Sequence, residues 1–240
     1  MSLLAVEALS RNFAGLRAVS EVSFCVEEGS ITALIGPNGA GKTTCFNLIA
    51  GALKPSSGRV IFAGEDVTGL PPEALCLRGI GRTFQIVRPM PELTVLENAM
   101  VGAFARESRL AAAEAVAREA LSRVGLLPKA GMPAAQLTLP DRKMLEVARA
   151  LATRPRLLLL DEVMAGLRAG EAGAIVESLR AVNAAGVTIL MIEHVMRVVM
   201  ALARHIVVLH HGEKIADGTP EEVTRDPAVI RSYLGERGAA

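Results

Sequence analysis

The chain has 240 residues, enough to bury a large hydrophobic core in one domain or in a core with a subdomain. Its 26 basic and 25 acidic residues nearly cancel, and it contains no Trp and one Tyr. This composition argues against a nucleic-acid partner, because such a partner requires a basic surface or stacking aromatic residues.

The sequence also argues against export and membrane insertion. No stretch reaches about 18 apolar residues, the length that a membrane-spanning helix needs. The N-terminus lacks a basic start followed by an apolar run, so we expect no signal peptide. The three cysteines lack the spacing of metal ligands and suit a reducing compartment. We therefore expect a protein of cytosolic type.

The N-terminal third predicts strands around a glycine-rich loop. Leu3–Leu9 and Val19–Val26 have apolar patterns typical of strands, and these turn-rich segments favour an antiparallel layer. Ile31–Ile35 is a short apolar run that predicts a buried strand. Thr43–Leu53 has its apolar residues at helical spacing, and Arg59–Ala63 is a further expected strand.

The glycine-rich loop between Ile35 and the following helix fits the phosphate-binding pattern G-x-x-x-x-G-K-[ST] in its full strand–loop–helix context. The expected ATP-binding residues are Gly36, Pro37, Asn38, Gly39, Ala40, Gly41, Lys42, Thr43 and Thr44. Backbone N–H groups would surround a phosphate, Lys42 would reach the β- and γ-phosphates, and the Thr43 hydroxyl would bind Mg²⁺. The alternative is a plain glycine turn with a solvated lysine.

The middle of the chain predicts a helical insert. A short helix begins near Leu70, and Gly79–Phe84 leads into Gln85. Helical patterns then cover Val95–Ala105, Leu110–Val124 and Asp141–Thr153. We therefore predict a helical subdomain over residues 88–154.

Alternating strands and helices return in the C-terminal part. The expected strands are Arg156–Leu160, Val187–Ile192, Ile206–Leu209 and Glu213–Ala216, and the expected helices are Glu171–Ala185, Val195–Ala203 and Pro220–Leu234. This order predicts an α/β P-loop NTPase fold with a mostly parallel sheet. We expect a single domain over residues 1–240, in which 1–87 and 155–240 form the nucleotide-binding core.

Polar residues follow three of the predicted strands. Asp161 and Glu162 end a run of four leucines, and in P-loop enzymes such acids hold Mg²⁺ and deprotonate the attacking water. His194 ends the next buried strand and is a candidate for contact with the γ-phosphate or the water. Gln85 is a candidate ligand of Mg²⁺ and water. The alternatives are a helix-capping acid, a structural histidine and a surface residue in a hinge loop.

These motifs, in this order, resemble an ABC-type ATPase over essentially the whole chain. Longer phrases resemble one of the two ATPase subunits of branched-chain amino acid importers: GIGRTFQIVRPMPELTVLENAMVGA, LLLLDEVMAGL and MIEHVMRVVMALARHIVVLHHGEKIADGTPEEV. The resemblance implies ATP and Mg²⁺ as cofactors, with Lys42 in the P-loop, Asp161 on the metal, Glu162 as base and His194 as switch histidine.

The resemblance also assigns Phe13 as the aromatic residue that stacks on adenine. Phe24 alternates with Val22 and Val26 on one face of its strand and is expected in the core, which leaves Phe13 available. The alternative is that Phe13 only anchors its loop.

Partners are implied by the resemblance alone. Two ATPase subunits, identical or different, would enclose two ATP molecules and drive integral-membrane permease subunits. The groove between Gln85 and the helical insert would receive a coupling helix from the permease. A periplasmic or extracellular solute-binding protein would take part indirectly. The chain would then lie peripherally on the cytoplasmic face of the inner or plasma membrane.

Two departures from the family pattern affect the half of the ATP site that the opposite subunit supplies. The family signature Leu-Ser-Gly-Gly-Gln corresponds to Leu137–Asp141, where Thr138 keeps a hydroxyl but Pro140 has no N–H to offer. Thr138 and Asp141 also fit a helix capping box, the alternative role for that hydroxyl. Arg168 stands where the family normally has Asp.

We therefore predict the ATP-hydrolysing subunit of an importer for branched-chain amino acids or a related small polar solute. One rival is a soluble ABC protein of repair or translation, but those usually join two cassettes or carry large inserts. The other rival is a regulatory subunit that binds ATP with little turnover. Glu162 and His194 argue against this second rival, and the altered signature favours it.

Overall fold

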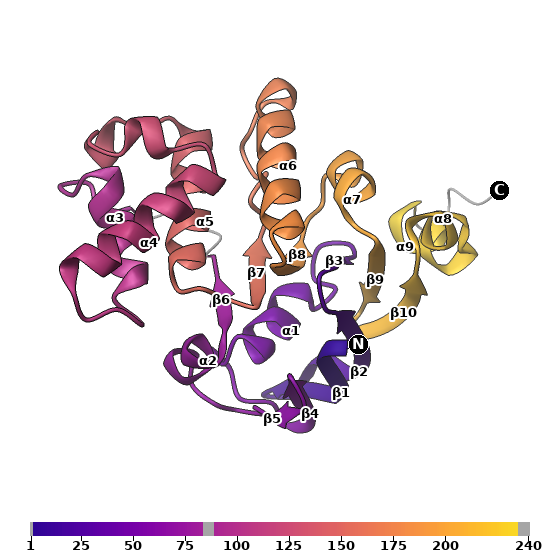
Figure 1. Cartoon of the computed structure of the whole chain (residues 1–240). Helices are drawn as coiled ribbons and strands as arrows, with labels where there is room; N and C mark the ends of the chain where they lie inside the picture. The colour runs from indigo at the N-terminus through magenta and orange to yellow at the C-terminus, as the bar shows by residue number, and fades with distance from the viewer. Residues whose placement is uncertain (1, 84–88, 235–240) are drawn as a thin grey trace. The chain divides into compact units, whose positions relative to one another are not determined.

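The computed structural model describes residues 2–83 and 89–234. By its internal contacts the chain divides into two compact units: Met1–Pro72 with Thr188–Ala240, and Glu73–Val187 (Figure 1). The sequence predicts a different division, into a nucleotide-binding core and a helical subdomain over residues 88–154. That division stays a prediction.

The first unit contains the expected antiparallel layer. Its strands are β1 (Ser2–Phe13), β2 (Leu16–Glu27), β4 (Ser57–Phe62) and β5 (Glu65–Asp66), in the order β2-β1-β4-β5. Val22, Phe24 and Val26 are buried on one face of β2, as their alternation predicts. Both long strands extend beyond the predicted ranges, because the residues that flank the turn at Ala14 and Gly15 also pair.

The first unit also holds the strands that carry the phosphate-binding loop. β3 (Ile31–Ile35) pairs in parallel with β8 (Thr188–Ile192) and with β9 (His205–His210). β10 (Glu213–Gly218) is antiparallel to β9. Every residue of β3 and β8 is buried, which explains why both sequences are apolar except for Thr32 and Thr188.

The helices of the first unit are shorter than their sequence patterns suggest. They are α1 (Lys42–Ile49), α7 (Met196–Leu202), α8 (Pro220–Arg225) and α9 (Pro227–Leu234). The tail that is predicted to be helical over Pro220–Leu234 forms two helices, because the chain leaves the helix at Asp226. Proline disfavours helical geometry in the residue before it, and the Asp226 carboxylate accepts from the Ala228 N–H at 2.7 Å to start α9.

The second unit combines two parallel strands with a group of helices. β6 (Ile80–Arg82) pairs with β7 (Leu157–Asp161). The helices are α2 (Pro72–Arg78), α3 (Val95–Ala103), α4 (Leu110–Arg123), α5 (Leu139–Ala152) and α6 (Ala169–Ala184), with 3-10 turns η1 (Leu127–Lys129) and η2 (Ala134–Gln136). Helices α3, α4 and α5 pack against one another (Figure 1). The predicted α/β class with parallel strands, an antiparallel layer and helical elements is confirmed.

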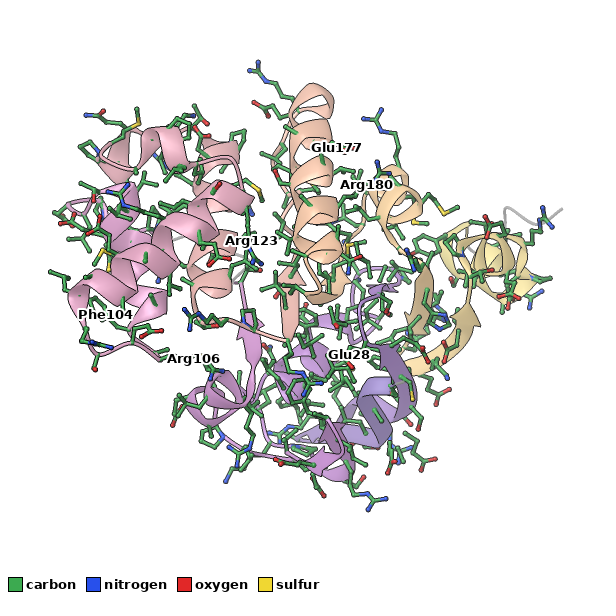
Figure 2. The ribbon with its side chains drawn as sticks, viewed as in Figure 1. Glu28, Phe104, Arg106, Arg123, Glu177 and Arg180 are labelled. Atoms are coloured by element: carbon green, nitrogen blue, oxygen red, sulfur yellow. The ribbon has the colours of Figure 1, made fainter. Side chains whose placement is uncertain are left out.

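One arginine joins two helix ends in this unit. Arg106, labelled in Figure 2, donates from Nε to the Thr153 carbonyl at 2.6 Å, directly after α5. Its Nη2 donates to the carbonyls of Cys76 and Leu77, each at 3.1 Å, in the last turn of α2. Carbonyls at helix ends lack partners within the helix, so one guanidinium satisfies both ends at once.

Candidate functional site

The phosphate-binding loop has the backbone that its glycines predict. Gly36, Gly39 and Gly41 have φ values of 149°, 80° and 97°. A Cβ atom on Gly36 would lie 2.1 Å from the Leu209 carbonyl oxygen, and one on Gly41 would lie 2.4 Å from the Ala18 carbonyl oxygen. At these two positions glycine is required both by conformation and by close approach of neighbouring backbone.

Lys42 turns back into its own loop. Its ammonium donates to the carbonyl oxygens of Gly36 at 2.7 Å and Pro37 at 2.9 Å, and only 9% of the residue is exposed. These bonds keep a buried positive charge inside the loop, at the start of a helix. The N-cap of α1 is Gly41, which provides no side-chain capping bond. A helix start of this kind can bind an anion through its backbone N–H groups.

The two acids lie at the end of β7, in the second unit. Asp161 is 3% exposed, and the Arg82 guanidinium lies 3.3 Å from its carboxylate. Burial raises the pKa of Asp161, and the neighbouring Arg82 charge opposes that shift. The next residue, Glu162, has a φ of 49°, and the buried Lys143 donates to its backbone oxygen at 3.4 Å. Left-handed backbone in a non-glycine residue is a strain that often accompanies function.

The predicted Mg²⁺ ligands Asp161 and Thr43 lie in different units, and the metal site stays a prediction. Carboxylate and hydroxyl oxygens, such as those of Asp161 and Thr43, are the ligand type that Mg²⁺ prefers. Within the described ranges, no group of three or more His, Cys, Asp or Glu side chains could hold a metal ion. Mg²⁺ usually takes one or two carboxylates and completes its shell with water and substrate phosphates.

Phe13 is an exposed aromatic residue at the end of β1. It is 39% exposed, whereas Phe24 is 4% exposed in the core, as predicted. The Arg11 guanidinium carbon lies 4.7 Å from the centroid of the Phe13 ring. One face of the ring is therefore supported by a cation, an arrangement that holds the ring in place.

Comparison with known families gives this geometry a context. A model of the ABC transporter family matches residues 19–165, and a model of the branched-chain amino acid ATP-binding cassette transporter family matches residues 213–239. This chain belongs to the ABC transporter family. The first match covers the P-loop and both acids, and the second covers the C-terminal segment.

Similar ABC cassettes span the whole chain. LivG of Salmonella typhimurium, a high-affinity branched-chain amino acid transport ATP-binding protein, is 42% identical over 98% of each chain. LivG of Escherichia coli is 41% identical and BraF of Pseudomonas aeruginosa is 40% identical, again over 98% of each chain. Within the ABC family, the chain groups with the cassettes of branched-chain amino acid transporters.

Solved ABC cassettes have the same fold. A nucleotide-free cassette is 35% identical with a TM-score of 0.89, and the ADP conformation of MJ1267 is 36% identical with the same score. Both comparisons cover 98% of this chain and 100% of the other. Among the residues that the structure describes, this cassette has no helix long and apolar enough to cross a membrane.

The signature segment of this cassette forms a self-contained helix start. Thr138 is the N-cap of α5: its hydroxyl accepts from the Asp141 N–H at 3.4 Å and donates to the Asp141 carboxylate at 2.7 Å. Lys129 lies 2.6 Å from the same carboxylate. Thr138 therefore caps α5, as the alternative interpretation of its hydroxyl predicts. A role of Thr138 in the ATP site of an opposite subunit stays a prediction. Sequence reasoning missed Lys129, which comes from a separate turn twelve residues earlier.

The remaining candidates are His194 and Gln85. His194 is exposed and comes two residues after β8, at the end predicted for it. Gln85 lies outside the described residues. Arg82, the partner of Asp161, was also missed, because its motif position gives no local sign of an ion pair with a residue 79 positions away.

Proposed function

We propose that this cassette is the ATP-hydrolysing subunit that energises a membrane importer of branched-chain amino acids. The observation that carries the proposal is identity of 40–42% over 98% of each chain with transport ATP-binding proteins of that substrate class. The P-loop, with its glycine backbone and buried Lys42, supports ATP as the nucleotide that drives the process.

In the proposed chemistry, the N–H groups of residues 36–44 and the Lys42 ammonium bind the phosphates of ATP. On binding, Lys42 exchanges the carbonyls of Gly36 and Pro37 for phosphate oxygens. Asp161, Thr43 and Gln85 would hold Mg²⁺, which would supply positive charge to neutralise the phosphates. Glu162 accepts the proton of the attacking water, and His194 positions that water against the γ-phosphate.

Phe13 is proposed to bind the adenine ring by stacking. Its exposed ring, supported by Arg11, offers a flat apolar surface without reading the edges of the base. Stacking of this kind contributes about 1–3 kcal/mol per base.

The proposed assembly contains two ATPase subunits and integral-membrane permease subunits, with a solute-binding protein acting indirectly. A dimeric cassette bound to ADP and Pi shares the fold with a TM-score of 0.80, and its identity of 24% supports the fold alone. The cassette would work peripherally, at the cytoplasmic face of the membrane. We propose no nucleic-acid partner, since the chain is almost neutral.

Uptake of radiolabelled leucine tests this proposal. A cell line that lacks the cassette should lose leucine uptake, the wild-type chain should restore it, and Lys42→Ala should not. A panel of unlabelled competitors then separates branched-chain amino acids from other small polar solutes. Undiminished leucine uptake in cells without the cassette would contradict the substrate class.

A regulatory subunit with little turnover is a second candidate, favoured by the signature segment. Thr138, Lys129 and Asp141 satisfy one another there, and Pro140 lacks an N–H. Purified cassette alone and cassette with a sister ATPase should be compared for phosphate release. If Glu162→Gln leaves the activity of the assembled transporter unchanged, the regulatory role replaces the catalytic one.

A further inference from the structure

A cavity of about 750 Å³ lies within the first unit, a volume in the range of small-molecule sites. Its polar lining comes from the end of β2, the turn that follows, the start of β3, and from β9 and β10. Thr32 lines the cavity near one end of β3, and Gly36 of the phosphate-binding loop follows the other end. Four residues of strand span about 13 Å, so the cavity is separate from the phosphate site.

One buried polar group beside this cavity lacks a partner. Thr32 is 1% exposed, and its hydroxyl has no hydrogen-bond partner among the residues that the structure describes. Thr32 is in register with His205 on the neighbouring strand β9, so both side chains lie on the face of the sheet that lines the cavity. A buried hydroxyl without a partner is unfavourable, and an occupant of the cavity can relieve it.

Positive charge gathers where β9 and β10 line the cavity. His205 Nε2 lies 2.5 Å from one carboxylate oxygen of Asp217, and the Lys214 ammonium donates to the other oxygen at 2.5 Å. Arg204, which directly precedes β9, is exposed, and in the described part of the chain its guanidinium has no ion pair or hydrogen bond. An anionic group on a ligand is the partner that this guanidinium lacks.

Negative charge and apolar surface come from β1, β2 and the turn after β2. Glu27 ends β2, and Glu28, labelled in Figure 2, follows it in the turn before β3; both are exposed and line the cavity. Apolar atoms of the lining come from Ala5, Val6 and Phe24. A ligand with one charge would meet only one of the two kinds of charged group in this cavity.

We infer that the cavity binds a small zwitterion, a molecule with an ammonium group, a carboxylate group and an apolar side chain. The carboxylate pairs with Arg204, the ammonium pairs with Glu27 and Glu28, and the Thr32 hydroxyl gains a partner in the ligand. Free amino acids and short peptides share this chemistry. The inference goes beyond the proposed function, which contributes only the choice of leucine as the first probe.

Leucine and the dipeptide Leu-Leu, each titrated into the full nucleotide-free chain and followed by ligand-observed NMR, test the class of ligand. Leucinamide lacks the carboxylate and 4-methylpentanoate lacks the ammonium. We expect both to bind about three- to tenfold more weakly than leucine, because each loses a charged contact at an exposed site. Tighter binding of Leu-Leu than of leucine would identify a peptide site, and the reverse an amino acid site. No saturable binding of either zwitterion, or equal binding of 4-methylpentanoate, would overturn the inference.

Arg204→Ala tests whether the ligand lies in this cavity. Its matched control is Arg225→Ala, at an exposed arginine on α8 that does not line the cavity. The Arg204 N–H, which donates to the Ile31 carbonyl at 2.9 Å, is kept in the variant. We expect Arg204→Ala to weaken leucine binding about three- to tenfold and to leave leucinamide binding unchanged. Equal leucine affinity in Arg204→Ala and Arg225→Ala would show that the zwitterion does not bind here.

Thr32→Val tests the buried hydroxyl, because it removes that group and keeps the shape of the side chain. We expect leucine affinity to fall about two- to tenfold, while the unfolding temperature of the free chain stays equal to that of the wild type or rises. A merely structural hydroxyl would give the opposite result, a lower unfolding temperature with wild-type affinity. That result would remove Thr32 from the site.

Lys42→Ala separates this inference from the proposed function. Leucine should bind Lys42→Ala as it binds the wild type, because the phosphate-binding loop does not line the cavity. Loss of leucine binding in Lys42→Ala would place the zwitterion at the phosphate-binding loop and overturn the inference. Leucine uptake that does not depend on the cassette would contradict the proposed function and leave the binding result intact.

Discussion

The N-termini of helices α1 and α5 are both expected to bind phosphate, but only that of α5 is capped by a side chain. Both are expected to face the phosphates of ATP, α1 from the P-loop and α5 from the signature segment. The start of α1 has Gly41 as N-cap with no side-chain capping bond, and positive φ values on both sides of Ala40. The start of α5 is capped by Thr138 and neutralised by a pair between Lys129 and Asp141.

The difference teaches how sequence decides whether a helix start binds an anion. Glycine supplies no side-chain acceptor to the helix start and lets the backbone curl, which suits an external phosphate as acceptor. Threonine and aspartate supply acceptors from within the chain, and proline removes a donor. The start of α1 has no side-chain cap, whereas the start of α5 has one in Thr138.

The largest expected effect follows from changing Glu162, the proposed base. Glu162→Gln keeps the shape of the side chain but cannot accept the proton of water, so steady-state hydrolysis should fall about 10²–10⁴-fold. ATP binding should hardly change, because the lost interaction belongs to the chemical step. Phosphate release and ATP affinity measured on the same preparation check this. Near-normal turnover would remove Glu162 from the base role.

The comparison of helix starts predicts unequal ATP sites in the assembled transporter. We hypothesise that this chain pairs with a different ATPase subunit whose signature is intact. Substitution of Lys42 should then abolish most ATP hydrolysis by the assembled transporter. Substitution of the equivalent lysine in the partner subunit should leave more of that activity. Loss of one preorganised donor costs roughly a hundredfold in rate, which sets the expected difference.

Grafting glycine into the α5 start sharpens the same comparison. Leu139→Gly with Pro140→Gly restores flexibility and an N–H, and should raise turnover at the site that this signature completes. If the two lysine substitutions reduce ATP hydrolysis equally, the two sites are equivalent. The same conclusion follows if this chain alone hydrolyses ATP as fast as the mixed pair.

Removing the aromatic ring at the end of β1 should have an intermediate effect. Phe13→Ala should weaken ATP binding by about 1–3 kcal/mol through loss of stacking. GTP affinity should fall in parallel, because a ring face does not distinguish base edges. Titration with both nucleotides checks this, with Leu16→Ala as a control at an apolar residue that is 69% exposed in the same hairpin. Unchanged affinity in Phe13→Ala would make Phe13 a packing residue.

The smallest effect concerns the capped start of α5. Burial raises the pKa of Asp141, but bonds from Lys129 and Thr138 outweigh this and lower the pKa overall. A lowered carboxylate pKa contributes stability above the ordinary aspartate range, and this contribution is lost as pH falls through the folded-state value. Asp141→Asn should therefore lower unfolding free energy by about 1 kcal/mol at pH 7 and by less below about pH 3.

Urea unfolding at the two pH values measures this change. Glu114→Gln, in an exposed pair with Arg118 on α4, is the control and should alter stability little at either pH. A pH-independent loss in Asp141→Asn would show that the carboxylate charge does not contribute.

The parts of the site that sequence predicts well are those encoded locally. The P-loop conformation follows from glycines spaced within one loop, and the burial of Phe24 follows from alternation along β2. Contacts between distant residues gave no such signal, as with Arg82 and Asp161 or Gly212 and Ala40. Pro227 is a local sequence signal for the break between α8 and α9. The helical pattern of apolar residues on both sides of it favoured a continuous helical tail instead.

The Arg106 contacts have a mechanical consequence for the second unit. One guanidinium holds the carbonyl ends of α2 and α5, so these two ends move together. Helix α5 has 14 residues and a length of about 21 Å, with Thr138 at its opposite end. We expect a displacement of the end of α2 to be passed through these hydrogen bonds to the Thr153 end of α5. Arg106→Ala would let the two helices respond to load separately.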